Sequence, residues 1–168
     1  VPILPRKFVK EMAKFKWFCN NCEYLIVPSE KMRNKILEYE IKTPMQIIPT
    51  GINLSQSKAV TKEAMRQFKV DYNIEEKKKV LVFLGRLGKE KNVYFLLEAF
   101  ALVLKKVPDT VLFIAGDGPE REGVEEKARS LGVFEQIIFA GYVDHQKVFT
   151  VLKLADVFTF PSKTETQG

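Results

Sequence analysis

Basic side chains follow a strongly apolar segment in a pattern suited to binding phosphate groups. Residues 80–84 form a continuous apolar run, and Gly85-Arg86-Leu87-Gly88-Lys89-Glu90-Lys91-Asn92 comes directly after it. Glycine allows a ligand to come close to the backbone, and the start of a helix after this loop favours an anion. Arg86 and Lys91 are therefore predicted to clamp a diphosphate. The alternative is a solvated basic turn, since lysine-rich turns are common in a basic chain.

Further candidate positions follow the later apolar segments. Gly116 lies in the turn Ala115-Gly116-Asp117-Gly118-Pro119, which matches only half of a dinucleotide-binding fingerprint. Tyr142 and Val143 follow a glycine, so their backbone is open to the edge of a base. Glu165 could accept hydrogen bonds from sugar hydroxyls. Taken singly, Glu165 is better interpreted as an acid of a surface loop than as a ligand.

The remaining candidates for metal or redox chemistry are isolated in the sequence. Cys19 and Cys22 form a C-x-x-C pair, but the chain offers no second cysteine pair, and the single histidine, His145, is distant. Ordinary packing of the cysteines is therefore favoured over a redox or zinc site, and no metal site is predicted. His145 adjoins Asp144 at a predicted helix start, where helix capping is favoured over a contact with a base.

The elements that must position these residues alternate between strand and helix. Apolar runs rich in β-branched and aromatic residues predict strands, and segments of three-to-four spacing predict helices between them. The predicted strands are 80–84, 111–115, 136–140 and 156–160, and the predicted helices are 61–72, 92–106, 120–131 and 144–154. The helix over 92–106 is apolar on most sides and is expected to be buried, with Asn92 as its cap. This alternation predicts an α/β fold with a doubly wound, Rossmann-like parallel sheet, in which ligands bind at the carboxyl ends of the strands.

The N-terminal part has a different pattern. Residues 6–18 are predicted to form a basic amphipathic helix, and short strands are predicted within 23–29 and at 45–48, with Ser29 capping a helix between them. The polar segment after Pro49 has no clear periodicity. We therefore predict the end of an N-terminal domain over 1–43, a linker over 44–60, and a second domain over 61–168.

Composition limits the classes of protein that need to be considered. The 168 residues are 46% apolar and 29% charged, which excludes collagen, a disordered chain and a small disulfide-stapled protein. The apolar runs are too short to cross a membrane. The 27 Lys and Arg against 21 Asp and Glu leave a charge of +6, which suits anionic partners such as nucleotides, nucleic acid or acidic lipid. Two cysteines favour a cytosolic location.

Five separated motifs resemble one known family in order and spacing. PTGIN, GRLGKEKN, AGDGP, FAGYV and ADVFTFPSKTETQG are similar to the retaining glycosyltransferases of family 4, which have the GT-B fold of two facing Rossmann-like domains. The segment from Cys22 to Asn53 is most similar to bacterial diacylglycerol glucosyltransferases. The resemblance implies transfer of a hexose, with retention, from a nucleotide sugar such as UDP-glucose to a lipid acceptor. It also implies that the transfer needs no metal or other cofactor and takes place at the cytoplasmic face of the membrane.

The resemblance also implies roles for individual residues. Arg86 and Lys91 match the basic pair that holds the donor diphosphate and stabilises its leaving charge. Glu165 matches the first acid of the family's E-x7-E signature, on the donor sugar. The other implied donor-binding positions are Gly51, Gly85, Gly116, Tyr142, Val143 and Gly168.

The second acid of that signature would lie beyond Gly168, and the acceptor-domain residues would lie upstream. We therefore expect this chain alone to transfer no sugar and at best to bind nucleotide weakly. The alternative function is a Rossmann-like nucleotide-binding module without chemistry. Nucleic acid is disfavoured because the aromatics in the apolar runs (Phe95, Phe100, Phe113 and Phe139) resemble core residues. The helix over 6–18 could meet an anionic membrane or pack on the rest of its domain.

Overall fold

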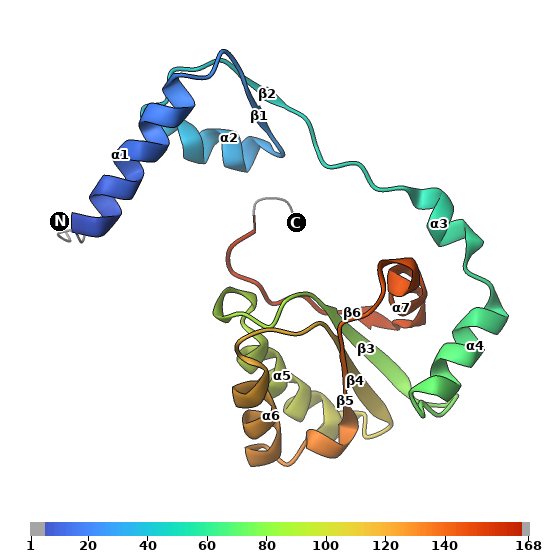
Figure 1. Ribbon diagram of the computed structural model, residues 1–168. Coiled ribbons are helices and arrows are strands. Elements are labelled where there is room, and N and C mark those ends of the chain that lie inside the picture. The colour runs from blue at the N-terminus through green and yellow to red at the C-terminus, as the bar shows by residue number, and fades with distance from the viewer. Residues whose placement is uncertain (1–5, 166–168) are drawn as a thin grey trace. The chain divides into compact units, whose positions relative to one another are not determined.

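A computed structural model describes residues 6–165, with side chains from residue 11 onward (Figure 1). Its contacts divide the chain into two compact units, one over 1–52 together with 165–168, and one over 53–164. The domain limits at 43/44 and 60/61 remain predictions. The segment predicted as a linker contains a strand and a short helix, as described below.

The first unit contains a small parallel β-pair and helices. Its elements are α1 (Arg6–Asn20), β1 (Leu25–Val27), α2 (Glu30–Leu37) and β2 (Met45–Ile47). Leu25 pairs with Met45, and the strands run parallel. Ser29 caps α2 as predicted, because its side chain accepts a hydrogen bond from the backbone N–H of Met32.

The end of α1 is tied to the segment that leads into β2. The Thr43 hydroxyl donates to the Cys19 carbonyl at 2.7 Å, and the Lys42 amide donates to the Asn20 side chain at 2.9 Å. Cys19 is buried, whereas Trp17 and Phe18 beside it are 69% and 62% exposed. Within residues 6–165, no helix combines the length and the apolar character that crossing a membrane requires.

The second unit is built on a parallel sheet whose described strands follow the order β5-β4-β3-β6. The strands are β3 (Lys79–Leu84), β4 (Thr110–Ala115), β5 (Ile137–Gly141) and β6 (Val157–Phe158), and the helices are α3 (Leu54–Ala59), α4 (Lys62–Asp71), α5 (Val93–Lys106), α6 (Arg121–Ser130) and α7 (Val148–Leu154). The chain first adds strands on one side of β3 and then returns to place β6 on the other side. Parallel sheets of this kind bind ligands at the carboxyl ends of the strands where the order reverses.

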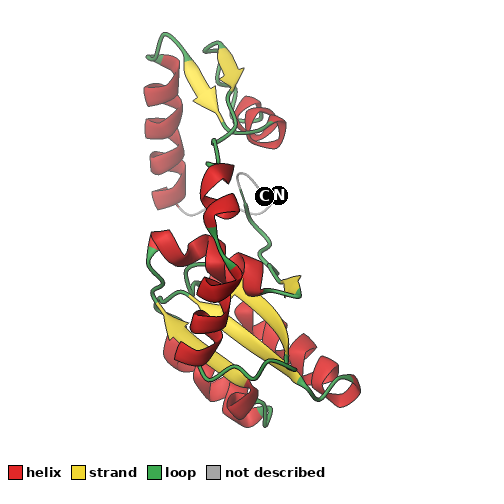
Figure 2. Cartoon of the chain, turned by 90° about the vertical axis from the view of Figure 1, so that its right-hand side faces the viewer, coloured by secondary structure: helices red, strands yellow, loops and turns green. Residues whose placement is uncertain are grey.

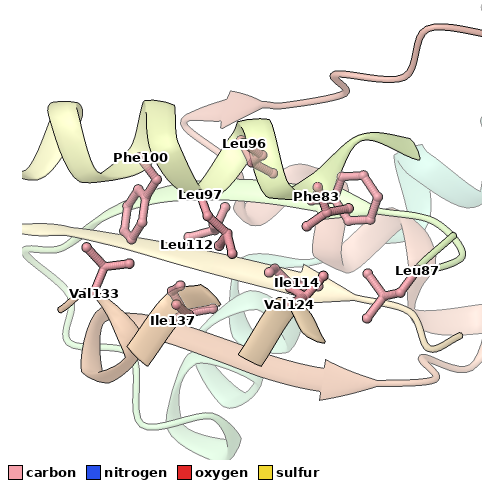
Figure 3. Packing of buried hydrophobic residues seen from close by; sticks show 12 residues of the cluster. Phe83, Leu87, Leu96, Leu97, Phe100, Leu112, Ile114, Val124, Val133 and Ile137 are labelled. Carbon is pink, nitrogen blue, oxygen red and sulfur yellow. The ribbon is translucent and has the colours of Figure 1, made fainter. Parts of the chain in front are cut away.

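Helices cover both faces of this sheet (Figures 1 and 2). The central strands β3 and β4 are mostly buried, as their continuous apolar sequences predict, whereas both residues of β6 are exposed. On one face, α5 and α6 pack over Phe83, Leu112 and Ile114 (Figure 3). On the other face, α4 and α7 pack over Val80, Val82 and Phe113, together with other residues. The predicted doubly wound α/β fold is therefore confirmed.

Helix α5 differs from its prediction in two ways. Phe95 and Leu102 are 58% and 62% exposed, so the expectation that Phe95 belongs to the core is wrong, although Phe100 and Phe113 are buried. Asn92 stands at the N-cap position, but its side chain makes no capping bond because the residue adopts a left-handed conformation with φ of 56°. When a helix is apolar on most sides, its sequence does not indicate which side faces the sheet.

The segment after Pro49 forms helix α3 despite its lack of apolar periodicity. The Asn53 side chain accepts hydrogen bonds from the Ser55 amide at 3.1 Å and from the Ser55 hydroxyl at 2.6 Å. This local capping stabilises a first turn without any apolar face. The predicted helix over 144–154 also divides into a short 3-10 turn, η3 (His145–Lys147), followed by α7.

Asp156 fastens β6 to the start of β3. Its carboxylate accepts hydrogen bonds from the Val80 amide at 2.8 Å and the Lys79 ammonium at 3.0 Å. The bond from the Val80 amide, followed by the bond from Lys79, holds the pKa of Asp156 below its ordinary value, although partial burial opposes the shift. The ionised carboxylate therefore stabilises the folded state.

Replacing Asp156 by asparagine is expected to lower stability at pH 7 by at most about 1 kcal/mol, because the carboxylate is partly exposed to screening solvent. Because the folded-state pKa lies below the unfolded one, this difference should be complete above about pH 5 and shrink below about pH 4, as the wild-type carboxylate is protonated. Urea unfolding of both proteins between pH 7 and pH 2.5 measures it. A difference that stays constant through the acid range would contradict this role.

Candidate functional site

The carboxyl ends of the central strands surround a cavity of about 350 Å³. Three loops line it: the loop after β3, the loop after β4, and the loop between β5 and α7. The lining residues are Leu84, Gly85, Arg86, Ala115, Gly116, Asp117, Tyr142, Val143, His145 and Val148. The predicted positions 85, 86, 116, 142 and 143 are thus brought to one place by the sheet.

The loops around this cavity are joined backbone to backbone. The Gly85 amide donates to the Ala115 carbonyl and the Leu87 amide to the Asp117 carbonyl, each at 2.9 Å. The Gly116 amide donates to the Gly141 carbonyl at 2.7 Å. A side chain at position 116 would place its Cβ only 1.9 Å from the Gly85 carbonyl oxygen. Gly116 was predicted to approach a ligand, and the structure shows that it also allows this close approach of two loops.

The predicted basic pair follows β3 on successive parts of one loop. Arg86 is exposed at the cavity and forms no ion pair with any residue that the structure describes. Lys91 ends the 3-10 helix η1 (Lys89–Lys91) and is half-buried, and its ammonium lies 5.3 Å from the centre of the Phe160 ring. Among the described residues, those that line the cavity do not include Lys91.

The loop after β5 presents both a backbone edge and side chains. Tyr142 is 84% exposed, whereas Val143 is 8% exposed and packs in the core. The Asp144 side chain accepts a hydrogen bond from the Gln146 amide, so a cap is present as predicted. The cap belongs to Asp144, however, and His145 itself lines the cavity. The sequence favours a capping role at His145, and this interpretation does not include the position of His145 in the cavity lining.

Three predicted donor-binding positions are not among the described residues that line this cavity. Gly51 belongs to the first unit and has open space around its Cα. Glu165 is half-buried and is grouped by its contacts with the first unit. Gly168 lies outside the described residues. The roles implied for these three positions stay predictions.

Asp117 is a cavity residue that the sequence analysis did not single out. Its carboxylate accepts the Gly118 amide at 2.7 Å and lies 3.9 Å from the guanidinium of Arg121 at the start of α6. The signal was available, because Asp117 follows directly after a predicted strand. Asp117 and Arg86 line the same cavity because β3 pairs with β4, and the sequence does not specify this pairing.

Within residues 6–165, neither the cysteines nor other side chains capable of binding a metal form a second site. Burial, reinforced by the nearby Cys22, raises the pKa of the Cys19 thiol. A raised pKa disfavours the thiolate that redox chemistry and metal binding require, which supports the packing interpretation. In the part of the chain that the structure describes, no group of three or more His, Cys, Asp or Glu residues is placed to hold a metal ion.

A family model described as Glycosyl transferases group 1 matches residues 64–168, which is more than half of the chain. The chain belongs to this family. This group 1 glycosyltransferase chain is 33% identical over 161 residues to the alpha-monoglucosyldiacylglycerol synthase of Streptococcus pneumoniae, which covers 94% of the chain and 36% of that protein. It is 32% identical to the enzyme of the same name from Acholeplasma laidlawii, over 90% of the chain and 38% of that protein. The chain therefore spans a little over a third of the length of these relatives.

Solved structures agree with the fold of this group 1 glycosyltransferase chain. The structure of Anabaena HepE in complex with UDP and glucose matches 92% of the chain and 42% of that protein, with a TM-score of 0.81 and 14% identity. Sucrose-phosphate synthase from Thermosynechococcus elongatus matches 99% of the chain and 42% of that protein, also with a TM-score of 0.81, at 20% identity. The predicted GT-B relationship is confirmed.

Proposed function

We propose that this chain supplies the donor-binding part of an enzyme that transfers glucose from UDP-glucose to a membrane lipid such as diacylglycerol, with retention of configuration. Arg86 and Lys91 hold the donor diphosphate, and the loop after β5 meets the base. Glu165 binds hydroxyls of the donor sugar, and the backbone at Gly168 meets the phosphates. Gly51, which belongs to the first unit, also contributes to donor binding.

The observation that carries this proposal is the convergence of three strand-terminal loops on a cavity lined by Arg86, whose guanidinium has no ion-pair partner among residues 6–165. An arginine without a carboxylate partner can bind two phosphate oxygens at once, and a diphosphate needs this geometry. Tyr142 is 84% exposed and lines the same cavity, so its backbone is the group proposed to meet the base. The names of the relatives from Streptococcus and Acholeplasma support glucose and diacylglycerol as the transferred group and the acceptor.

The proposed chemistry is electrostatic. When the bond between the sugar and the diphosphate breaks, negative charge grows on the departing diphosphate. Fixed cations at Arg86 and Lys91 stabilise that charge more in the transition state than in the bound donor, and this difference accelerates the reaction. We propose that these cations do the work for which other transferases use a metal ion, so that the reaction needs none.

We also propose that the first unit brings the enzyme to an anionic membrane at its cytoplasmic face. Helix α1 carries Lys14 and Lys16, and its aromatic residues Trp17 and Phe18 are exposed within this unit. Exposed aromatics beside lysines are typical of helices that lie in a membrane interface. Such a surface would bring the site to a lipid acceptor, whereas nucleic acid is not a proposed partner.

Transfer is tested directly with the intact protein, UDP-glucose carrying a labelled glucose, and vesicles containing diacylglycerol. We expect labelled glucosyl lipid with an α-linkage by NMR, because the donor is itself α-linked, and we expect the rate to survive EDTA. Sedimentation with anionic and neutral vesicles in the same preparation should show binding to the anionic ones.

Calorimetric titrations, together with the outcomes of the transfer and sedimentation experiments, separate the alternatives. UDP, UDP-glucose and NAD are titrated calorimetrically, and only the first two are expected to bind. Binding of UDP without any transfer would favour a nucleotide-binding module and overturn the enzymatic proposal. A β-linked product would overturn retention, loss of activity with EDTA would overturn metal independence, and equal sedimentation with both vesicle types would overturn the anionic membrane surface.

A further inference from the structure

The loop that carries Lys91 is held by a segment that lies far from it in sequence. The Asn92 side chain donates to the Pro161 carbonyl at 3.3 Å. The Ser162 hydroxyl and the Lys163 amide both donate to the Glu90 carbonyl, at 3.1 and 3.4 Å. Because η1 is only one 3-10 turn, these bonds to the segment after β6 add to the few that fix its position.

Phe160 lies at the centre of this junction. Its ring faces the Lys91 ammonium at 5.3 Å, within the range of a cation–π interaction. The same ring stacks on Phe83, with centroids 6.0 Å apart and an angle of 19° between the planes. Phe83 is fully buried between β3 and α5 (Figure 3), so the Phe160 ring is anchored to the core.

This junction lies at the carboxyl ends of β3 and β6, which are neighbours in the sheet. β6 pairs with β3 on the side opposite to β4, so the order of the strands reverses between β3 and β6 (Figure 1). The loop with Lys91 leaves the carboxyl end of β3, and the segment with Phe160 leaves the carboxyl end of β6. Ligands of doubly wound sheets bind where these two ends meet.

A lysine side chain is flexible, and holding it in one position costs conformational entropy. An aromatic face beside the ammonium restricts the positions that the ammonium can take before a ligand arrives. The ligand then meets a cation that is already in place, so less entropy is lost on binding.

We propose that Phe160 is a positioning residue for Lys91, with its ring holding the ammonium at the junction of β3 and β6 for the leaving diphosphate. The bond between Asn92 and Pro161 keeps the loop over the ring. This inference rests on the proposed function, because it assigns a task to the same diphosphate-binding lysine. Phe160 acts through Lys91 and does not itself touch the reacting atoms.

The test compares Phe160→Leu with Phe158→Leu in the intact protein. Leucine keeps an apolar side chain at position 160 and removes the π face, and Phe158 belongs to the same ring stack, at 5.8 Å from Phe160. We expect Phe160→Leu to weaken calorimetric UDP binding ~5- to 10-fold, in line with a partly desolvated cation–π contact, and Phe158→Leu to change it less than about twofold. The conservative variant Phe160→Tyr keeps a π face, so its UDP affinity should lie within about twofold of wild type.

A double-mutant cycle with Lys91→Ala identifies the partner of the ring. If Phe160 acts through Lys91, Phe160→Leu should have no further effect once Lys91 is alanine. An equal loss in both backgrounds, or an equal loss in Phe158→Leu, would overturn the positioning role. Where Phe160→Leu fails to fold, pentafluorophenylalanine at position 160 replaces it, since this ring has a similar shape but a face that no longer attracts a cation.

The same cycle separates this inference from the proposed function. If Lys91→Ala alone leaves UDP binding and transfer unchanged, the proposed diphosphate clamp is wrong, and the positioning role falls with it. If Lys91→Ala abolishes binding while Phe160→Leu has no effect in the wild-type background, the clamp stands and only the positioning role is overturned.

Discussion

Replacing Arg86 by alanine is expected to lower kcat/KM for sugar transfer by about 10²- to 10³-fold, the range for removing one preorganised donor to a developing negative charge. Arg86 lies at the cavity and forms no ion pair with the residues that the structure describes, so its charge is available to the donor. Because it would bind the departing diphosphate more strongly than the intact donor, most of the loss should appear in kcat. Steady-state kinetics with UDP-glucose separate kcat from KM.

Lys89 provides the matched control for this prediction. It is an exposed cation three residues after Arg86, in the same loop, so Lys89→Ala removes the same charge from the same region. We expect Lys89→Ala to change kcat/KM by less than about twofold, since an exposed charge that does not touch the ligand is screened by solvent. Arg86→Lys should recover only part of the rate, because a lysine cannot hold two oxygens in a planar fork. Equal losses in Arg86→Ala and Lys89→Ala would mean that only the net charge of the loop matters.

The central strands of the second unit, β3 and β4, could be predicted from the sequence because each contains a continuous apolar run. The run at 80–84 corresponds to β3, Lys79–Leu84, and the run at 111–115 to β4, Thr110–Ala115. Such runs, bounded by glycine or proline, can be covered on both sides only inside a layered sheet. The loop positions that follow them were predictable for the same reason, because all parallel strands end at one edge.

Contacts between distant segments could not be predicted in this way. Phe160 meets Lys91 because β6 pairs with β3 and not with its predecessor β5, and strand order is not encoded in local periodicity. His145 reaches the cavity for a related reason, since η3 turns it toward the ends of β3 and β4. The exposure of Phe95 was missed because an apolar helix gives no local indication of which face its neighbours cover.

Gly116 is the residue at which fold and site depend on the same backbone contact. It has φ of 139°, a conformation that side chains rarely adopt, and an added Cβ would lie 1.9 Å from the Gly85 carbonyl oxygen. That carbonyl cannot simply move aside, because the Gly85 amide is bonded to Ala115 and the Gly116 amide to Gly141. Relieving the clash would therefore separate the loops that form the cavity.

Gly116→Ala is therefore expected to destabilise the protein by about 3 kcal/mol or more, since overpacking and backbone strain each cost about 1–3 kcal/mol. Gly132→Ala is the matched control, because Gly132 also has a positive φ, of 71°, but has open space around its Cα. Strain alone should cost that variant about 1 kcal/mol. Urea unfolding at 25 °C compares the two, and equal losses would show that strain, and not the contact with Gly85, makes glycine necessary. Because the contact also shapes the cavity, Gly116→Ala should weaken UDP binding under conditions where it remains folded, whereas Gly132→Ala should leave UDP binding unchanged.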